Sequence, residues 1–173
     1  MKRGIFPLLA VALVFGAAGA WFGAKKFEAE PAQPQASASF YSRSLPDAKG
    51  ATVSMAQWKG RPVVLNFWAT WCAPCVEEMP ELTALQKEIQ PKNIQILGIG
   101  IDNAGSISAF VDKYQIGYPL YVAGIDGSEL SRELGNKAGG LPFTVLLDAS
   151  GKVRKTYLGR LKMDELRRDL DTL

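Results

Sequence analysis

The order of apolar and polar residues predicts alternating strands and helices from residue 62 onward. Residues 62–68, PVVLNFW, form a β-branched and aromatic run that is too hydrophobic for a half-exposed strand. We therefore expect a central strand that is covered on both faces. After Cys72 and Cys75, apolar residues recur at helical spacing, and Pro80 is expected to bend this helix; the apolar positions are Met79, Leu82, Leu85 and Ile89.

The remaining elements follow from the same patterns. Strands are expected at residues 94–101, 120–122, 144–147 and 153–158, and helices at 106–114 (capped by Ser106), 128–134 and 163–173. Turn residues at 46–50 and 148–151 predict two hairpins, and a short helix is expected at 55–59. A βαβ unit followed by a hairpin and a helix predicts an α/β fold, with a mixed sheet and helices on both faces.

The N-terminus carries an export signal. Residues 4–24 contain no charge, are preceded by Lys2 and Arg3 and are followed by Lys25 and Lys26. As a helix this run would be about 31 Å long, which matches a bilayer core. We expect residues 1–27 to be an uncleaved signal-anchor with a cytoplasmic start. The alternative is a cleaved signal peptide, for which residues 18–20, AGA, resemble a cleavage site.

Residues 28–39, EAEPAQPQASAS, have almost no apolar bulk, so we expect a flexible linker there and a single domain at residues 40–173. The chain has 173 residues, with 20 Lys and Arg against 17 Asp and Glu. Four of the 20 basic residues precede the linker, in a segment without acids, so 16 basic residues face 17 acidic ones in the rest. A nearly neutral body without a basic stripe argues against nucleic-acid binding.

Histidine is absent, which excludes imidazole catalysis and removes the commonest metal ligand. Cys72 and Cys75 are the two cysteines of the sequence, too few for a four-ligand structural zinc site. We therefore expect no metal and no other cofactor. A c-type haem attachment would need His after Cys75, where Val76 stands.

The sequence Trp71-Cys72-Ala73-Pro74-Cys75 lies where the predicted buried strand turns into a helix. A helix N-terminus carries free N–H groups and a partial positive charge, which stabilise the thiolate of Cys72. Cys75 lies one turn into the helix, close enough to attack a mixed disulfide on Cys72. Pro74 costs little at the start of a helix and stiffens the bridge. An inert structural disulfide is the alternative interpretation.

The string VVLNFWATWCAPC, followed by Glu78, Pro80 and residues 140–142, GLP, resembles the thioredoxin superfamily, and within it the membrane-anchored TlpA/ResA-like thiol-disulfide oxidoreductases. The resemblance covers about residues 40–173. It implies a thioredoxin fold with an N-terminal β-hairpin and a central helix-strand insertion at about residues 106–139.

The same resemblance implies roles for individual residues. Cys72 would be the attacking thiol, Cys75 the resolving thiol of a redox-active disulfide, and Pro142 a cis-proline that helps to present substrate. Thioredoxin has an acid where this chain has Asn66, so Glu78, on the helix face of Cys75, is the candidate proton acceptor; a solvated glutamate is the alternative. Trp71 would flank the thiol and Trp68 would pack inside. The expected substrate-binding residues are Trp71, Ala73, Pro74 and Leu141. Phe143 departs from the small polar residue that is common after this proline.

These residues predict an enzyme that exchanges thiols and disulfides outside the cytoplasm. We expect a monomer that reduces cysteine pairs in exported proteins, such as apocytochrome c or cuproproteins, with electrons from a membrane dithiol carrier. A disulfide oxidant and a copper chaperone remain alternatives, because both could use the same dithiol. A peroxidase of the peroxiredoxin type would need Thr where Ala69 stands.

Overall fold

A five-stranded mixed sheet forms the centre of the molecule, in the order β5-β4-β3-β6-β7. The computed structural model describes residues 34–173. The strands are β3 (Val63–Trp68), β4 (Gln95–Gly100), β5 (Leu120–Val122), β6 (Phe143–Leu147) and β7 (Val153–Leu158). β3 pairs in parallel with β4 and antiparallel with β6. β4 pairs in parallel with β5, and β6 pairs antiparallel with β7. This is the thioredoxin-like α/β fold that the sequence predicts.

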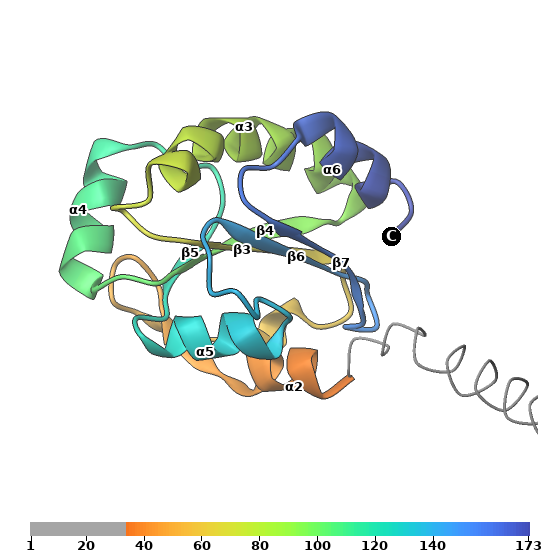
Figure 1. The fold of residues 1–173 in the computed structure, drawn as a ribbon, viewed down its shortest axis with the longest axis horizontal. Coiled ribbons are helices and arrows are strands. Elements are labelled where there is room, and N and C mark those ends of the chain that lie inside the picture. The colour runs from red at the N-terminus through yellow and green to blue at the C-terminus, as the bar shows by residue number, and fades with distance from the viewer. Residues whose placement is uncertain (1–33) are drawn as a thin grey trace, which may run out of the picture. The chain divides into compact units, whose positions relative to one another are not determined.

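The helices cover both faces of this sheet (Figure 1). α3 (Ala73–Ile89) and α6 (Met163–Leu170) lie on one face, and α2 (Pro34–Ser42) and α5 (Asp126–Glu133) lie on the other. α4 (Ala104–Lys113) buries Ile107 and Phe110 in the same apolar cluster as the core residues of α3. Two short 3₁₀ helices, η2 (Met55–Trp58) and η3 (Gln90–Lys92), complete the chain order.

The central strand is buried along its whole length, as predicted. All six residues of β3 are buried, and they alternate between two core clusters, with Val64 and Trp68 on the α3 face and Val63, Leu65 and Phe67 on the α5 face. Helices on both faces remove both sides of the strand from water, which explains its continuous apolar run. The N-terminal hairpin is also confirmed, as β1 (Ser44–Pro46) paired antiparallel with β2 (Thr52–Ser54).

The expected flexible linker is wrong for residues 34–39, which belong to helix α2. The last turn of the helix contains Phe40, which is fully buried, and Tyr41, which is 5% exposed. α2 packs against α5 and η2. Among the described residues, the folded part of the chain therefore includes α2 and begins before residue 40. Composition missed this helix because the two aromatic residues that hold it lie at its C-terminal end.

Several helix boundaries also differ from the expectations. α4 begins at Ala104 instead of Ser106, because Asn103 is its N-cap and accepts a hydrogen bond from Ser106 N through its side chain (2.8 Å). Ser106 is therefore inside the helix. α5 begins two residues before the expected 128–134 and ends one residue before it, and α6 ends at Leu170 instead of 173. Helix ends depend on which polar group reaches the free N–H groups, and spacing alone does not decide this.

The expected signal-anchor, residues 1–27, lies outside the described residues, as does the linker up to residue 33. Within residues 34–173, no helix combines the length and the apolar character that a bilayer span requires.

Candidate active site

Cys72 and Cys75 form a disulfide at the junction of β3 and α3. Cys72 is the N-cap of α3 and has an extended backbone, while Cys75 lies in the first turn. The carbonyl oxygen of Cys72 accepts hydrogen bonds from the N–H groups of Cys75 (3.0 Å) and Val76 (3.1 Å). Cys72 is 6% exposed and Cys75 is fully buried. An incoming sulfur therefore has access to Cys72 in preference to Cys75.

The helix α3 favours a negative charge at Cys72. It has 17 residues, and its first turn contains no acidic side chain that would oppose a thiolate. The partial positive charge of a helix N-terminus acts mainly near its first turn, and Cys72 is the N-cap directly before that turn. Reduction of the disulfide would therefore leave a sulfur whose ionised form is stabilised at position 72.

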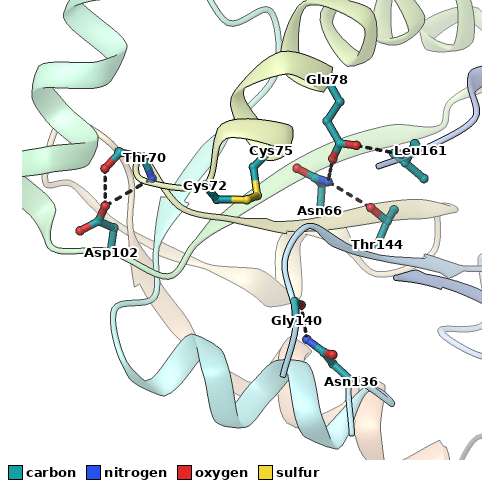
Figure 2. The surroundings of a disulfide bond; sticks show 10 residues. All are labelled: Asn66, Thr70, Cys72, Cys75, Glu78, Asp102, Asn136, Gly140, Thr144 and Leu161. Atoms are coloured by element: carbon teal, nitrogen blue, oxygen red, sulfur yellow. Dashed lines mark hydrogen bonds between the residues drawn. A yellow bond between two sulfur atoms is a disulfide. The ribbon is translucent and has the colours of Figure 1, made fainter. Parts of the chain in front are cut away.

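The loop that carries Pro142 lies at the same edge of the sheet. The peptide bond between Leu141 and Pro142 is cis. Because Phe143 at the start of β6 pairs with Phe67 near the end of β3, Pro142 is brought to the side of the sheet where the chain leaves β3 for Cys72. Asn136 Nδ2 donates to the carbonyl oxygen of Gly140 (2.9 Å), which fixes the preceding loop (Figure 2).

The residues expected to bind substrate are accessible at this edge. Trp71 is 70% exposed, Ala73 and Pro74 are exposed, and Leu141 is half-buried. Trp68 is fully buried instead, with its ring centroid 4.9 Å from that of Phe110. Trp71 and Trp68 thus take the outer and inner positions that the resemblance implies.

Glu78 is fully buried behind the disulfide, one turn along α3 from Cys75. Asn66 Nδ2 donates to Glu78 Oε1 (2.8 Å), and Leu161 N–H donates to Glu78 Oε2 (3.0 Å), as Figure 2 shows. Burial raises the pKa of Glu78 above its usual value, although both hydrogen bonds and the charge of Arg160 act in the opposite direction. Glu78 is therefore an internal carboxyl group, not the solvated glutamate of the alternative interpretation.

Asn66 connects Glu78 to the sheet. Its Nδ2 also donates to Thr144 Oγ1 (3.0 Å), which lies directly across from it on β6. The Oδ1 atom of Asn66 is buried and has no hydrogen-bond partner within residues 34–173. Sequence reasoning placed Asn66 where thioredoxin has an acid, but missed its contact with Glu78. The period-two pattern of the strand could have placed it on the helix side, because Val64 and Trp68 lie on that face.

Two further features of the site were also missed. Thr70 N–H donates to Asp102 Oδ2 (3.3 Å), and the Thr70 hydroxyl donates to the same oxygen, so the chain before Cys72 is tied to the segment after β4. Arg160 contacts Glu77 and Glu81 on the outer side of α3. These contacts have no local sequence signal, because their partners are far apart in the chain. Thr70 and Asp102 are 32 residues apart, and Arg160 is 83 residues from Glu77 and 79 from Glu81.

Phe143, whose departure from the usual residue was noted above, is a core residue. It is 3% exposed and faces the α5 side of the sheet, with its ring centroid 6.0 Å from that of Phe67. It therefore points away from the disulfide. In the described part of the chain, no three Cys, Asp or Glu side chains gather in an arrangement that could hold a metal ion.

A thioredoxin-like fold with a disulfide at the N-terminus of the helix after its central strand defines the class of this protein, a thiol-disulfide oxidoreductase. The chain belongs to the Redoxin family, which matches residues 28–173. It is 28% identical to the thiol-disulfide oxidoreductase ResA of Geobacillus thermodenitrificans over 130 residues, 75% of this chain and 72% of that protein. It is 32% identical to the thioredoxin-like protein YneN of Bacillus subtilis over 132 residues, 74% of each chain.

Solved structures agree with this assignment. DsbF of Mycobacterium tuberculosis, determined in mixed oxidised and reduced forms, superimposes with a TM-score of 0.65 at 25% identity and covers 79% of this chain and 96% of its own. A DsbF homologue from Corynebacterium diphtheriae gives the same TM-score, 0.65, at 26% identity, with 76% and 83% covered. The fold and the redox activity class follow from these similarities.

Proposed function

We propose that this enzyme reduces disulfides in exported proteins at the outer face of the cytoplasmic membrane. The observation that carries this proposal is the pairing of Cys72, which is slightly exposed at a helix N-terminus, with a fully buried Cys75 and a fully buried Glu78. The uncharged run at residues 4–24 supports export, and the names of the ResA relatives support thiol-disulfide exchange. The proposed substrates are cysteine pairs such as those of apocytochrome c or cuproproteins.

In the first step, the Cys72 thiolate attacks one sulfur of the substrate disulfide. A bond forms between Cys72 and that sulfur, the substrate disulfide breaks, and the leaving thiolate takes a proton from water. Lowering a thiol pKa from about 8.5 to about 7 raises the thiolate fraction at pH 7 from about 3% to about half, and corresponds to about 2 kcal/mol. Nucleophilicity falls about fivefold at the same time, so the net gain in rate is only about threefold.

In the second step, Cys75 resolves the mixed disulfide. Its thiol gives a proton to the Glu78 carboxylate, and the new thiolate attacks the Cys72 sulfur. The Cys72–Cys75 disulfide forms, the mixed disulfide breaks, and the second substrate sulfur leaves as a thiolate that takes a proton from water, while Glu78 returns its proton to water. A carboxyl group with a raised pKa is a better match to a thiol than an ordinary glutamate, and burial raises the pKa of Glu78 in this way. Because the rate gain at Cys72 is small, much of the catalysis comes from holding Cys75 in place for this intramolecular step.

The two electrons that leave the dithiol must be returned. A membrane dithiol carrier would reduce the Cys72–Cys75 disulfide, with one disulfide broken on the enzyme for each one formed on the carrier. Pro142, Leu141, Trp71, Ala73 and Pro74 would hold the substrate chain at the edge of the sheet during exchange.

The direction of exchange is tested by redox equilibration with glutathione. A reductant should give a potential well below the roughly −120 mV of DsbA, whereas a value near that figure would make the protein an oxidant. Partners are identified with Cys75→Ser, which should leave Cys72 covalently bound to its substrates. The Cys72→Ser/Cys75→Ser variant is the matched control, and a single-cysteine variant that traps no exported protein would contradict the proposal.

Location is tested separately by membrane fractionation of the full chain. An uncleaved anchor should keep the protein in the membrane fraction after alkaline extraction, with Met1 or the residue after it at the N-terminus. A soluble periplasmic product that lacks residues 1–20 would support the cleaved signal peptide instead.

A further inference from the structure

The short connector between β7 and α6, residues 159–162, makes contacts near the site through its first three residues. Gly159 N–H donates to the carbonyl oxygen of Pro142 (2.8 Å). Arg160 Nη1 lies 3.2 Å from Glu77 Oε2, and its Nη2 lies 2.9 Å from Glu81 Oε1. The next residue is Leu161, whose N–H group donates to Glu78 Oε2. The connector is therefore bonded both to the cis-proline loop and to the helix of the cysteines.

Glu77, Glu78 and Glu81 place three carboxyl groups within five residues of α3, and they differ in exposure. Glu78 is fully buried, while the side chains of Glu77 and Glu81 are 60% and 46% exposed. Three adjacent negative charges repel one another, and the buried one has the least water to screen it. Arg160 bridges the two outer carboxylates, which brings its positive charge to the outer side of Glu78.

Three elements contribute groups that act on the charge of Glu78. β3 contributes the Asn66 amide, the connector contributes Leu161 N–H and the charge of Arg160, and α3 contributes the opposing charge of Glu81. Glu77, also on α3, is the second ion-pair partner of Arg160. The phenol of Tyr118, before β5, is buried and interacts electrostatically with Glu78. Burial raises the pKa of Tyr118, and the charge of Glu78 raises it further. Among these groups Arg160 carries the one full positive charge.

We propose that Arg160 is a positioning residue for Glu78. By bridging Glu77 and Glu81 it fastens the connector to α3, keeps Leu161 N–H on Glu78 Oε2 and holds a positive charge beside the buried carboxylate. The guanidinium suits this role because its planar fork reaches two carboxylates at once. The positioning itself stands on the contacts above, and only its effect on catalysis rests on the proposed role of Glu78.

We expect the loss of Arg160 to change the pKa of Glu78 and to have little effect on the stability of the fold. The ion pairs of Arg160 are half-exposed, and pairs of this kind add little to stability. Loss of Arg160 would remove an attractive charge and loosen the Leu161 hydrogen bond. Both changes disfavour the carboxylate, and both therefore raise the pKa of Glu78.

The test is a carbon-13 NMR titration of the Glu78 carboxyl in the oxidised, full-length protein in detergent, assigned by its loss in Glu78→Gln. Arg160→Gln should move the midpoint upward by up to about one pH unit, since the charge is partly screened by solvent. Arg160→Lys keeps the charge and should recover part of that shift. The shift caused by Arg160→Gln should also shrink at high salt.

Arg167→Gln is the matched control. Arg167 is similarly exposed and also bridges two carboxylates, Glu88 and Asp164, but it is not adjacent to the Leu161 bond. A midpoint in Arg160→Gln that moves no further than in Arg167→Gln would overturn the proposal. If Arg160→Lys shifted the Glu78 midpoint as far as Arg160→Gln does, the positive charge of Arg160 would not be the cause of the shift.

A kinetic measurement separates this inference from the proposed function. The pH profile for release of a substrate thiol from the mixed disulfide should move together with the NMR midpoint in Arg160→Gln. If the titration moves and the kinetic profile does not, Arg160 positions Glu78 as proposed, but Glu78 is not the proton acceptor of Cys75.

Discussion

At the scale of single residues, the protein buries the carboxyl group of Glu78 in its core with two hydrogen-bond donors. Glu78 receives one hydrogen bond on each oxygen, from Asn66 and from Leu161. A buried carboxylate is costly unless it is paired, and two neutral donors compensate only part of its lost hydration. The remaining cost appears as the raised pKa of Glu78. The same arrangement that suits proton transfer therefore makes the ionised protein less stable.

This cost predicts a pH dependence of stability. Because the pKa of Glu78 is raised by folding, its contribution to stability is fully present below the pKa of an unfolded glutamate, about 4.3, and is lost as the pH rises through the folded value. Urea unfolding of the oxidised protein should show that Glu78→Gln gains stability relative to wild type over this window. The Gln amide can be accommodated, because Asn66 can turn its unpartnered Oδ1 toward it.

The free energy of unfolding of the wild type is subtracted from that of Glu78→Gln at each pH. This is needed because Asp148 and Asp169 have lowered pKa values, so they make both proteins more stable as the pH rises. A difference that stays constant from pH 4 to pH 8 would contradict the raised pKa of Glu78.

Asn66 gives a second prediction at this scale. Asn66→Leu leaves Glu78 Oε1 without its donor, so the pKa of Glu78 should rise further and the stability at pH 8 should fall by about 1–3 kcal/mol. Thr144→Val is the control, because it removes only the hydroxyl that accepts from Asn66 and leaves the donor to Glu78 in place. Denaturant unfolding and the Glu78 titration measure the two effects. Equal pKa values in Asn66→Leu and Thr144→Val would refute the assigned role of the amide.

At the scale of elements, β3 and α3 position the cysteine pair, and the neighbouring strands hold β3 in place. The strand is held by parallel pairing to β4 and antiparallel pairing to β6, so the residue at which it ends is fixed on both sides. The hydrogen bond from Thr70 to Asp102 then ties the outgoing loop to the segment after β4. The result is a rigid entry into α3, which sets the position of Cys72 at the helix N-terminus.

The helix α2 allows a prediction about the N-terminal boundary of the folded unit. Phe40 is fully buried in the cluster on the α5 face, so Phe40→Ala should cost about 3–5 kcal/mol through lost burial and the cavity it leaves. Ala38→Ser, at an exposed position of the same helix, should change stability by at most about 0.5 kcal/mol. Thermal or urea unfolding checks both. If the two variants were equally stable, α2 would not be part of the core.

At the scale of the whole molecule, the sheet separates two apolar clusters, and the buried residues of both lie between Phe40 and Leu170. The cluster on the α3 face contains Cys72 and Cys75, so the disulfide is part of the core and not an addition to its surface. Because the buried residues of both clusters lie within the described residues, we predict that a chain of residues 32–173 folds alone.

We expect the free energy of unfolding of this shortened protein to lie within about 0.5 kcal/mol of that of the full chain. In solution, the two proteins should reduce a polypeptide disulfide at the same rate. The two measurements are urea unfolding and a substrate-thiol release assay. A shortened chain that aggregates or unfolds earlier would show that residues 1–31 contribute to the fold.

The sequence by itself determined the order of the elements after α2 and the place of the cysteine pair. The central strand, the helix after it and the final hairpin were all predictable, because apolar periodicity and turn residues act over a few positions. The N-cap position of Cys72 follows from the same local signals, and the resemblance to TlpA/ResA-like proteins added Pro142 and Glu78.

Only the tertiary structure decided what surrounds Glu78, that residues 34–42 form helix α2 and which residue caps α4. The donors to Glu78 are Asn66, 12 residues away on the strand, and Leu161, 83 residues away on a connector. Such contacts depend on how strands and helices pack, and neither composition nor periodicity records which distant N–H group will reach a buried oxygen. The chemistry of the sulfurs was therefore predictable from the sequence, whereas the environment that sets their proton transfer was not.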